Sequence, residues 1–189
     1  DSGGLYKEFM GKLSEEAFSD KMKLFIESES GFLIPNKESY KISNKHLLMF
    51  EFLGFITAKA ILDDIKLYPN LSPIFLNNIL QIENSFTDLK GYDSELYKNL
   101  VALKQYEGDV ENDFGLSFAI SEENAYGKIQ SKNLIENGVN IPVTNNNRLL
   151  YIQKITEYKL NFQFKEQCLN FRNGMQKVLD MEILKLFTG

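Results

Sequence analysis

The sequence predicts an α+β fold that is mainly α, in which a helical body carries a smaller helix-plus-β-hairpin part. Three observations support this prediction. Apolar residues recur at helical spacing along most of the chain, whereas residues 116–120 alternate with a period of two. Polar seams at residues 81–95 and near residue 144 flank that alternation. A chain of 189 residues is also long enough to bury a core of its own.

The N-terminal part of the chain predicts a helix followed by a short extended segment. The helix is expected over residues 5–18, where charged residues separate an apolar stripe of Leu5, Phe9, Leu13 and Phe18. A second apolar cluster, over residues 22–26, should pack on the same core. Residues 31–35 should be extended, because the residue before a proline is disfavoured in the helical region.

Residues 46–62 are apolar nearly all round, which is typical of a helix covered on several sides. Gly54 and Ala58, four residues apart, would let a neighbouring helix approach closely. The run contains Glu51 and Lys59 and is shorter than the roughly 20 residues that cross a bilayer. We therefore expect a buried core helix and no membrane span.

The next two helices are predicted from their caps. Ser72 and Pro73 start a helix that runs to about Leu80, since serine caps a helix N-terminus and proline is tolerated at the first position. A polar connection over residues 81–91 leads to a helix capped by Asp93. The apolar stripe of that helix consists of Leu96, Leu100, Leu103 and Tyr106.

A small antiparallel sheet is expected after this helix. Residues 116–120 alternate apolar and small or polar side chains, which indicates a half-buried strand. Turn signals occur at residues 122–124 and 137–138, and residues 140–143 read as a returning strand.

Helices are predicted again in the last quarter of the chain. A capping cluster at residues 144–147 precedes a helix whose apolar residues are Tyr151, Ile155 and Tyr158. A helix over residues 162–178 would carry Phe164, Cys168, Phe171 and Met175, and another begins near Met181.

Composition excludes several classes of function. Acids and bases are interspersed and the net charge is −5, so there is no basic field for nucleic acid. The single cysteine, Cys168, excludes an internal disulfide and a cysteine zinc cluster. No signal peptide, metal-ligand spacing or glycine-rich phosphate loop is present. We expect an intracellular protein without cofactor or metal, and a chain that begins inside a longer protein.

The reactive side chains do not form a catalytic set. His46 opens the most apolar helix and is expected to be a packing or capping group, since no partner for a base or ligand role is evident. Cys168 lies within an amphipathic helix and should behave as a small hydrophobe. The acidic pairs Asp63-Asp64 and Glu122-Glu123 are expected to be solvated. These residues do not predict a complete enzyme.

A series of motifs runs through the chain in order: Asp1–Leu5 with Glu8-Phe9, His46-Leu47 with Phe50–Gly54 and Ala60, Asp88-Leu89 with Asp93 and Leu96–Leu100, Asn137-Gly138 with Ile141–Asn145 and Asn147, and finally Gln167, Phe171 and Gly174. With these motifs the whole chain resembles the N-terminal lobe (N-lobe) of a HECT-type ubiquitin-protein ligase. The segment 97–144 looks closest to the papillomavirus E-six-associated branch. Ala58 stands where the family usually has a second glycine.

The resemblance implies a division into a large subdomain, about residues 1–85 and 157–189, and a small subdomain, about residues 86–156. The small subdomain would bind the ubiquitin-conjugating enzyme in a groove. The matching positions are Leu96, Leu100, Leu103, Tyr106, Leu116, Tyr151 and Ile155. We expect Tyr106, Leu116 and Tyr151 to be exposed in that groove, and the leucines to be shared between groove and core.

The resemblance also implies a function. The full-length protein would accept ubiquitin as a thioester on a cysteine of a second lobe (the C-lobe) and pass it to a substrate lysine in the cytoplasm and/or nucleus. That lobe, with its Thr-Cys-Phe motif, is absent from this sequence, so we expect no catalytic residue here. This chain would recruit the charged conjugating enzyme. The alternatives are a non-catalytic helical scaffold or pseudo-ligase, and a self-contained cysteine enzyme that uses Cys168.

Overall fold

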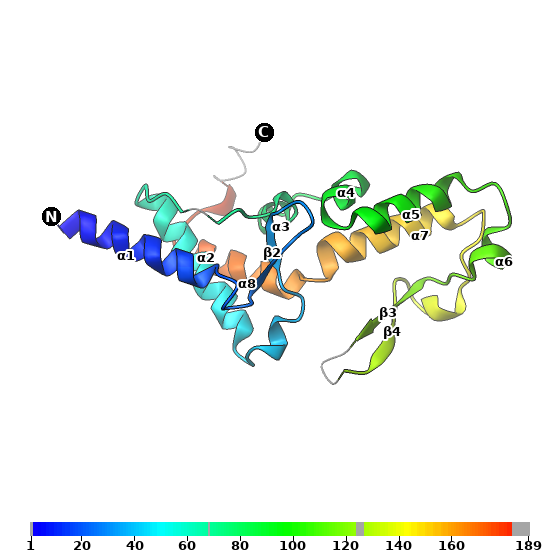
Figure 1. Ribbon diagram of the computed structural model, residues 1–189, viewed down its shortest axis with the longest axis horizontal. Helices are drawn as coiled ribbons and strands as arrows, with labels where there is room; N and C mark the ends of the chain where they lie inside the picture. Colours follow the sequence, from blue (N-terminus) through cyan, green and yellow to red (C-terminus); the bar gives the residue numbers. More distant parts are fainter. Residues whose placement is uncertain (1, 68, 124–126, 183–189) are drawn as a thin grey trace. The chain divides into compact units, whose positions relative to one another are not determined.

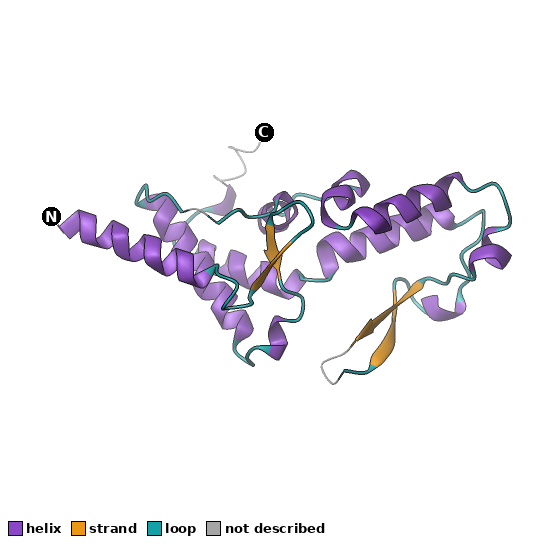
Figure 2. Cartoon of the chain, viewed as in Figure 1, coloured by secondary structure: helices purple, strands orange, loops and turns teal. Residues whose placement is uncertain are grey.

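The computed structural model describes residues 2–67, 69–123 and 127–182. The fold is α+β and mainly α, with two small antiparallel sheets (Figures 1 and 2). The chain divides into two compact units, a terminal unit made of Asp1–Glu83 and Phe164–Gly189 and a central unit made of Asn84–Gln163. The family subdomain boundaries expected near residues 85 and 157 stay a prediction.

The terminal unit contains helices from both ends of the chain. Its elements are α1 (Ser2–Ala17), β1 (Phe25–Glu27), β2 (Leu33–Pro35), η1 (Ser39–Lys41), α2 (His46–Leu62), α3 (Pro73–Leu80) and α8 (Lys165–Gln176). The predicted bounds of α2 and α3 are confirmed, and the Ser72 side chain accepts a hydrogen bond from the backbone N–H of Ile74. β1 and β2 pair antiparallel, which confirms the extended segment before Pro35.

Helices α2 and α8 pack backbone to backbone in the terminal unit (Figure 1). A Cβ on Gly54 would lie 2.7 Å from the carbonyl carbon of Phe171 and closer still to its oxygen. A Cβ on Gly174 would lie 2.8 Å from the carbonyl carbon of Glu51. The predicted close approach at Gly54 is confirmed, and Ala58 is fully buried. Glycine is needed at the crossing because no side chain fits between the two helices.

Aromatic rings fill the core beside this crossing. Phe25 lies 5.4 Å from both Phe50 and Phe75, and Phe75 lies 5.1 Å from Phe171, measured between ring centroids. The tilted and edge-on geometries are those that aromatic pairs prefer, and each pair contributes about 0.5–1.5 kcal/mol beyond its buried area. This cluster ties β1, α2, α3 and α8 together.

The central unit is built from short helices and one hairpin. Its elements are η2 (Phe86–Asp88), α4 (Leu89–Tyr92), α5 (Ser94–Gln105), α6 (Val110–Phe114), β3 (Ala119–Glu123), β4 (Ile129–Asn133), η3 (Gly138–Asn140), α7 (Arg148–Glu157) and the π-helix η4 (Tyr158–Phe162). The polar connection predicted over residues 81–91 contains helical turns that the sequence did not predict, since η2 lies within it and α4 begins in it. Helix α6 is a further element that the sequence did not predict.

The predicted pairing of the hairpin is confirmed only in part. β3 pairs with β4 (Figure 2), so that Ala119 lies opposite Asn133. Residues 141–143 pair antiparallel with residues 116–118, the first part of the predicted strand, through a bridge between Ser117 and Pro142. There the Phe118 N–H donates to Ile141 and the Val143 N–H donates to Leu116. The turn expected at residues 122–124 is wrong for its first two residues, which belong to β3, and Asn124 lies outside the described residues.

The C-terminal helices differ in detail from the prediction. The helix expected over residues 162–178 is observed as the shorter α8 (Lys165–Gln176), and Phe162 instead ends the π-helix that extends α7. Residues 181–182 are helical, and the rest of the helix expected from Met181 lies outside the described residues.

Candidate protein-binding face

The residues predicted to bind a partner all lie in the central unit, on α5, on α7 and in the segment between residues 106 and 116. Helix α5 forms because the Asp93 carboxylate caps it, accepting from the Leu96 N–H at 2.9 Å, and Glu95 places negative charge in the first turn. α5 and α7 lie side by side (Figure 1).

Four of the predicted contact residues are core rather than surface. They are Leu100, Leu103, Tyr151 and Ile155, each 5% exposed or less. The expectation that Tyr151 lines an exposed groove is therefore wrong. The Tyr151 ring packs edge-on against Phe118, with centroids 5.6 Å apart. This contact forms because the facing sides of α5 and α7 share one core with the segment that carries Phe118. The leucines belong to that core as well.

The remaining predicted residues, Leu96, Tyr106 and Leu116, are partly exposed. Against Tyr106 lies Phe114, which sequence reasoning missed and which is 42% exposed. The rings of Tyr106 and Phe114 meet edge to face, with centroids 4.8 Å apart and an interplanar angle of 87°. We call these two residues the aromatic rim. The signals that could have revealed it are the Asp109 cap and the left-handed Gly115 that bound α6.

A carboxylate hydrogen-bonds to the aromatic rim, and other acidic residues lie nearby in the chain. The Tyr106 hydroxyl donates to Asp113 Oδ2 at 2.7 Å, and this hydrogen bond raises the pKa of Tyr106, so the phenol is a donor at neutral pH. Hydrogen bonds from Asn112 lower the pKa of Asp109. Glu107 and Glu111 are exposed nearby in the chain. The rim therefore combines apolar rings with a hydrogen-bonded carboxylate.

A second polar cluster of the central unit centres on Glu122 of β3. Its carboxylate accepts from the Tyr158 hydroxyl and from Gln163 Nε2, while the Tyr92 hydroxyl donates to Gln163 Oε1 at 3.0 Å. Burial raises the pKa of Tyr92 to about 12 and also raises the pKa of Tyr158, which keeps both phenols protonated. The Lys132 ammonium lies 5.2 Å from the Tyr158 ring centroid. These hydrogen bonds join β3 to the π-helix and its end, and they stabilise the central unit.

His46 takes part in a buried network of the terminal unit. Ser39 Oγ lies 2.8 Å from His46 Nδ1, and Gln167 Nε2 donates to Ser39 Oγ at 3.2 Å. Ser39 Oγ can accept from Gln167 and donate to His46 Nδ1 at the same time, an arrangement that suits the neutral imidazole. Ser39 is fully buried, whereas His46 is half-buried. The expectation of a packing role for His46 agrees with this geometry.

The network predicts a pH dependence of stability. Burial lowers the pKa of His46 in the folded protein, and Glu166 opposes this only in part. The unfolded chain then binds the proton more readily, so stability is lost as the pH falls below the ordinary histidine pKa of about 6.5. We expect the urea midpoint to fall between about pH 7.5 and about pH 5.5, and to fall less in His46→Gln. An equal fall in both proteins would contradict this contribution.

Cys168 is a buried side chain, and Asp63 of the first acidic pair joins two helices. Cys168 is 5% exposed, and burial raises the pKa of its thiol, as expected for a small hydrophobe. Asp63 accepts from the Tyr6 hydroxyl at 2.7 Å and from Lys59 Nζ at 3.1 Å, so it anchors α1 to α2. In the part of the chain that the structure describes, no group of three potential metal ligands occurs.

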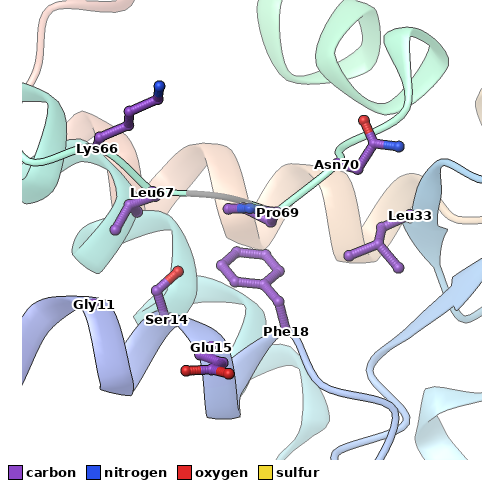
Figure 3. A pocket seen from close by; sticks show the side chains of 9 residues that line it. All are labelled: Gly11, Ser14, Glu15, Phe18, Leu33, Lys66, Leu67, Pro69 and Asn70. Carbon is purple, nitrogen blue, oxygen red and sulfur yellow. The ribbon is translucent and has the colours of Figure 1, made fainter.

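Figure 3 shows a pocket of the terminal unit, with a volume of about 530 Å³. α1 contributes Ser14, Phe18 follows the end of that helix, and the segment after α2 contributes Leu67 and Pro69. A second hollow, of about 470 Å³, is lined mainly by apolar side chains of α1 and α2. None of the predicted contact residues lines either pocket. Within the described ranges, no helix has the length and hydropathy of a membrane-spanning segment.

Comparisons with known proteins agree with one another. Residues 11–189 match the family model described as HECT-domain (ubiquitin-transferase). The chain is 38% identical over 187 residues to a probable E3 ubiquitin protein ligase of Schizosaccharomyces pombe, a match that covers 99% of this chain and 18% of that protein.

Two further relatives give the same result. The chain is 36% identical over 187 residues to the E3 ubiquitin-protein ligase UPL6 of Arabidopsis thaliana, covering 99% of this chain and 18% of the relative. It is 31% identical over 194 residues to the ubiquitin-protein ligase E3B of Homo sapiens, a match that covers 100% of this chain and 18% of the relative. The chain thus spans 18% of the length of each of these three relatives.

Proposed function

Because the chain belongs to the HECT-domain (ubiquitin-transferase) family, we propose that it is the N-lobe of a ubiquitin-protein ligase and that its central unit recruits the ubiquitin-charged conjugating enzyme. The observation that carries this proposal is the aromatic rim, a pair of ordered aromatic rings held at the surface in the segment that the family resemblance assigns to the partner. The likeness to the papillomavirus E-six-associated branch stays a prediction.

The chemistry of ubiquitin transfer is proposed for the whole protein. A cysteine thiolate of a second lobe would attack the thioester of the charged conjugating enzyme, release that enzyme's thiolate and hold ubiquitin as a new thioester. A substrate lysine amine would then displace the ligase thiolate and form an amide bond. Cys168 is buried and its thiol pKa is raised, so we assign this step to a cysteine outside the sequence.

The rim has the character of a contact surface for a transient partner. Aromatic side chains are enriched among the few residues that carry most of the energy of an interface. Tyr106 and Phe114 lose little side-chain entropy on binding, because each ring is already held by the other. We expect an interface near or below roughly 1,200 Å², since a conjugating enzyme must leave after it delivers ubiquitin.

Phe114→Ala tests this proposal. We expect it to weaken binding of a conjugating enzyme at least about fivefold, because it removes an exposed ring from the face. The thermal midpoint should hardly change, since Phe114 is 42% exposed. A panel of conjugating enzymes would be titrated against the labelled chain, with affinities from calorimetry and the contact face from chemical-shift changes.

Ile129→Ala is the matched control. Ile129 is 79% exposed on β4 of the same unit, so its truncation removes a comparable apolar surface away from the rim. This control substitution should leave the affinity for the conjugating enzyme unchanged. Absence of binding across a broad panel would refute recruitment and favour the scaffold alternative.

A further inference from the structure

Arg148 is the first residue of α7, yet its side chain forms hydrogen bonds at the C-terminal end of α5. Its Nη1 donates to the backbone oxygen of Leu103 at 3.4 Å and also to the backbone oxygen of Tyr106. A cation is unfavourable at the N-terminus of a helix and favourable at a C-terminus. Arg148 is therefore poorly placed for α7 and well placed for α5, whose last carbonyl groups have no partner inside the helix.

The turn before α7 also holds the loop of residues 106–110, which follows α5. Asn145 Oδ1 accepts from the Val110 N–H at 3.0 Å, and its Nδ2 donates to the Gly108 oxygen at 2.8 Å. Asn147 keeps the turn in shape, because its Oδ1 accepts from the Thr144 N–H at 2.7 Å. Residues 106–110 are thus held by two side chains, that of Asn145 in the turn before α7 and that of Arg148, the first residue of α7.

Tyr106 is the point where these contacts converge. Arg148 holds its backbone oxygen, and Asp113 accepts from its hydroxyl at 2.7 Å. A Cβ on Gly108 would lie 2.6 Å from the Tyr106 ring, so the loop backbone lies directly against that ring. Phe114 packs against the ring edge to face. Displacing the Tyr106 backbone would move the whole aromatic rim.

From these contacts we propose that Arg148 is a positioning residue for conjugating-enzyme binding, acting through Tyr106. This inference rests on the proposed function. The planar guanidinium presents several N–H groups in a fixed plane, whereas lysine is a flexible point donor. Arg148 therefore sets the position of the rim through the geometry of its side chain rather than through its charge alone.

A double-mutant cycle tests the inference. Calorimetry would measure the affinity of the wild type, Arg148→Ala, Tyr106→Ala and the double variant for the conjugating enzyme that gives the largest chemical-shift changes. We expect each single change to weaken binding about tenfold. If Arg148 acts through Tyr106, the double variant should also lose about tenfold, whereas independent effects would multiply to about a hundredfold. A product of the single effects, or unchanged binding in Arg148→Ala, would overturn the inference.

Two further measurements separate positioning from a general loss of structure or charge. Arg148→Lys keeps the charge, so a positioning role predicts that most of the loss remains, and full recovery would overturn it. In the free protein, Arg148→Ala should shift the NMR signals of Tyr106 and Phe114 while the amides of β3 and β4 keep theirs. A wild type that binds no conjugating enzyme would refute the proposed function itself, whereas a multiplicative cycle refutes only the role of Arg148.

Discussion

Gly174→Ala should destabilise the terminal unit by about 3 kcal/mol or more, because inserting a methyl group into a close-packed contact forces the backbone apart. The added Cβ would lie 2.8 Å from the backbone nitrogen of Phe55 and the carbonyl carbon of Glu51. Neither atom belongs to a flexible side chain, so α2 and α8 would have to separate. Hydrogen exchange would show this as lost protection of the amides of both helices, with a large fall in the urea midpoint.

Gly11→Ala is the matched control for this substitution. Gly11 lies within α1, and nothing lies within 4 Å of the position that its Cβ would take. There the same change should stabilise the helix by up to about 1 kcal/mol, because alanine has the higher helix propensity. Opposite signs at the two glycines would demonstrate the packing constraint. Equal effects at both positions would contradict it.

Tyr151→Ala should destabilise the central unit by about 3 kcal/mol, since removal of a buried aromatic ring leaves a cavity. Tyr151 is 5% exposed and packs on Phe118, which is 1% exposed. For a unit of this size we expect the thermal midpoint to fall by about 10 °C or more. Circular dichroism and hydrogen exchange of α5 and α7 would measure the change.

Gln153→Ala controls for the substitution of a residue in α7, because Gln153 is exposed on that helix. Its stability should stay within about 0.5 kcal/mol of the wild type. If Tyr151→Ala instead left the midpoint unchanged and only weakened partner binding, Tyr151 would be a surface anchor and its assignment to the core would fail.

The helices that the sequence predicts best are those whose signals are local. α2 is apolar all round, and α3 starts at a serine cap followed by proline, so neither depends on distant residues to be recognised. Two other elements have no apolar pattern to reveal them, although α6 has a cap at Asp109. α6 is only five residues long, and all five residues of β4 are exposed, so neither has an apolar period that could reveal it.

The candidate site shows a different limit. Helical spacing groups Leu96, Leu100, Leu103 and Tyr106 on one stripe, but the same spacing serves a core and a surface equally well. The division between them depends on α7 and Phe118, which cover the leucines and leave Tyr106 partly exposed. Phe114 joins the face only because a short helix turns the chain back toward Tyr106.

The pairing of α2 with α8 has a consequence for synthesis on the ribosome. The two helices are separated by about 100 residues, which include the whole central unit and take roughly 5 to 20 s to translate at about 5–20 residues per second. During that interval the glycine face of α2 has no partner, although the helix is the most apolar of the chain. The nascent protein therefore passes through a stage in which chaperones would find an exposed hydrophobic helix, and only the emergence of α8 ends it.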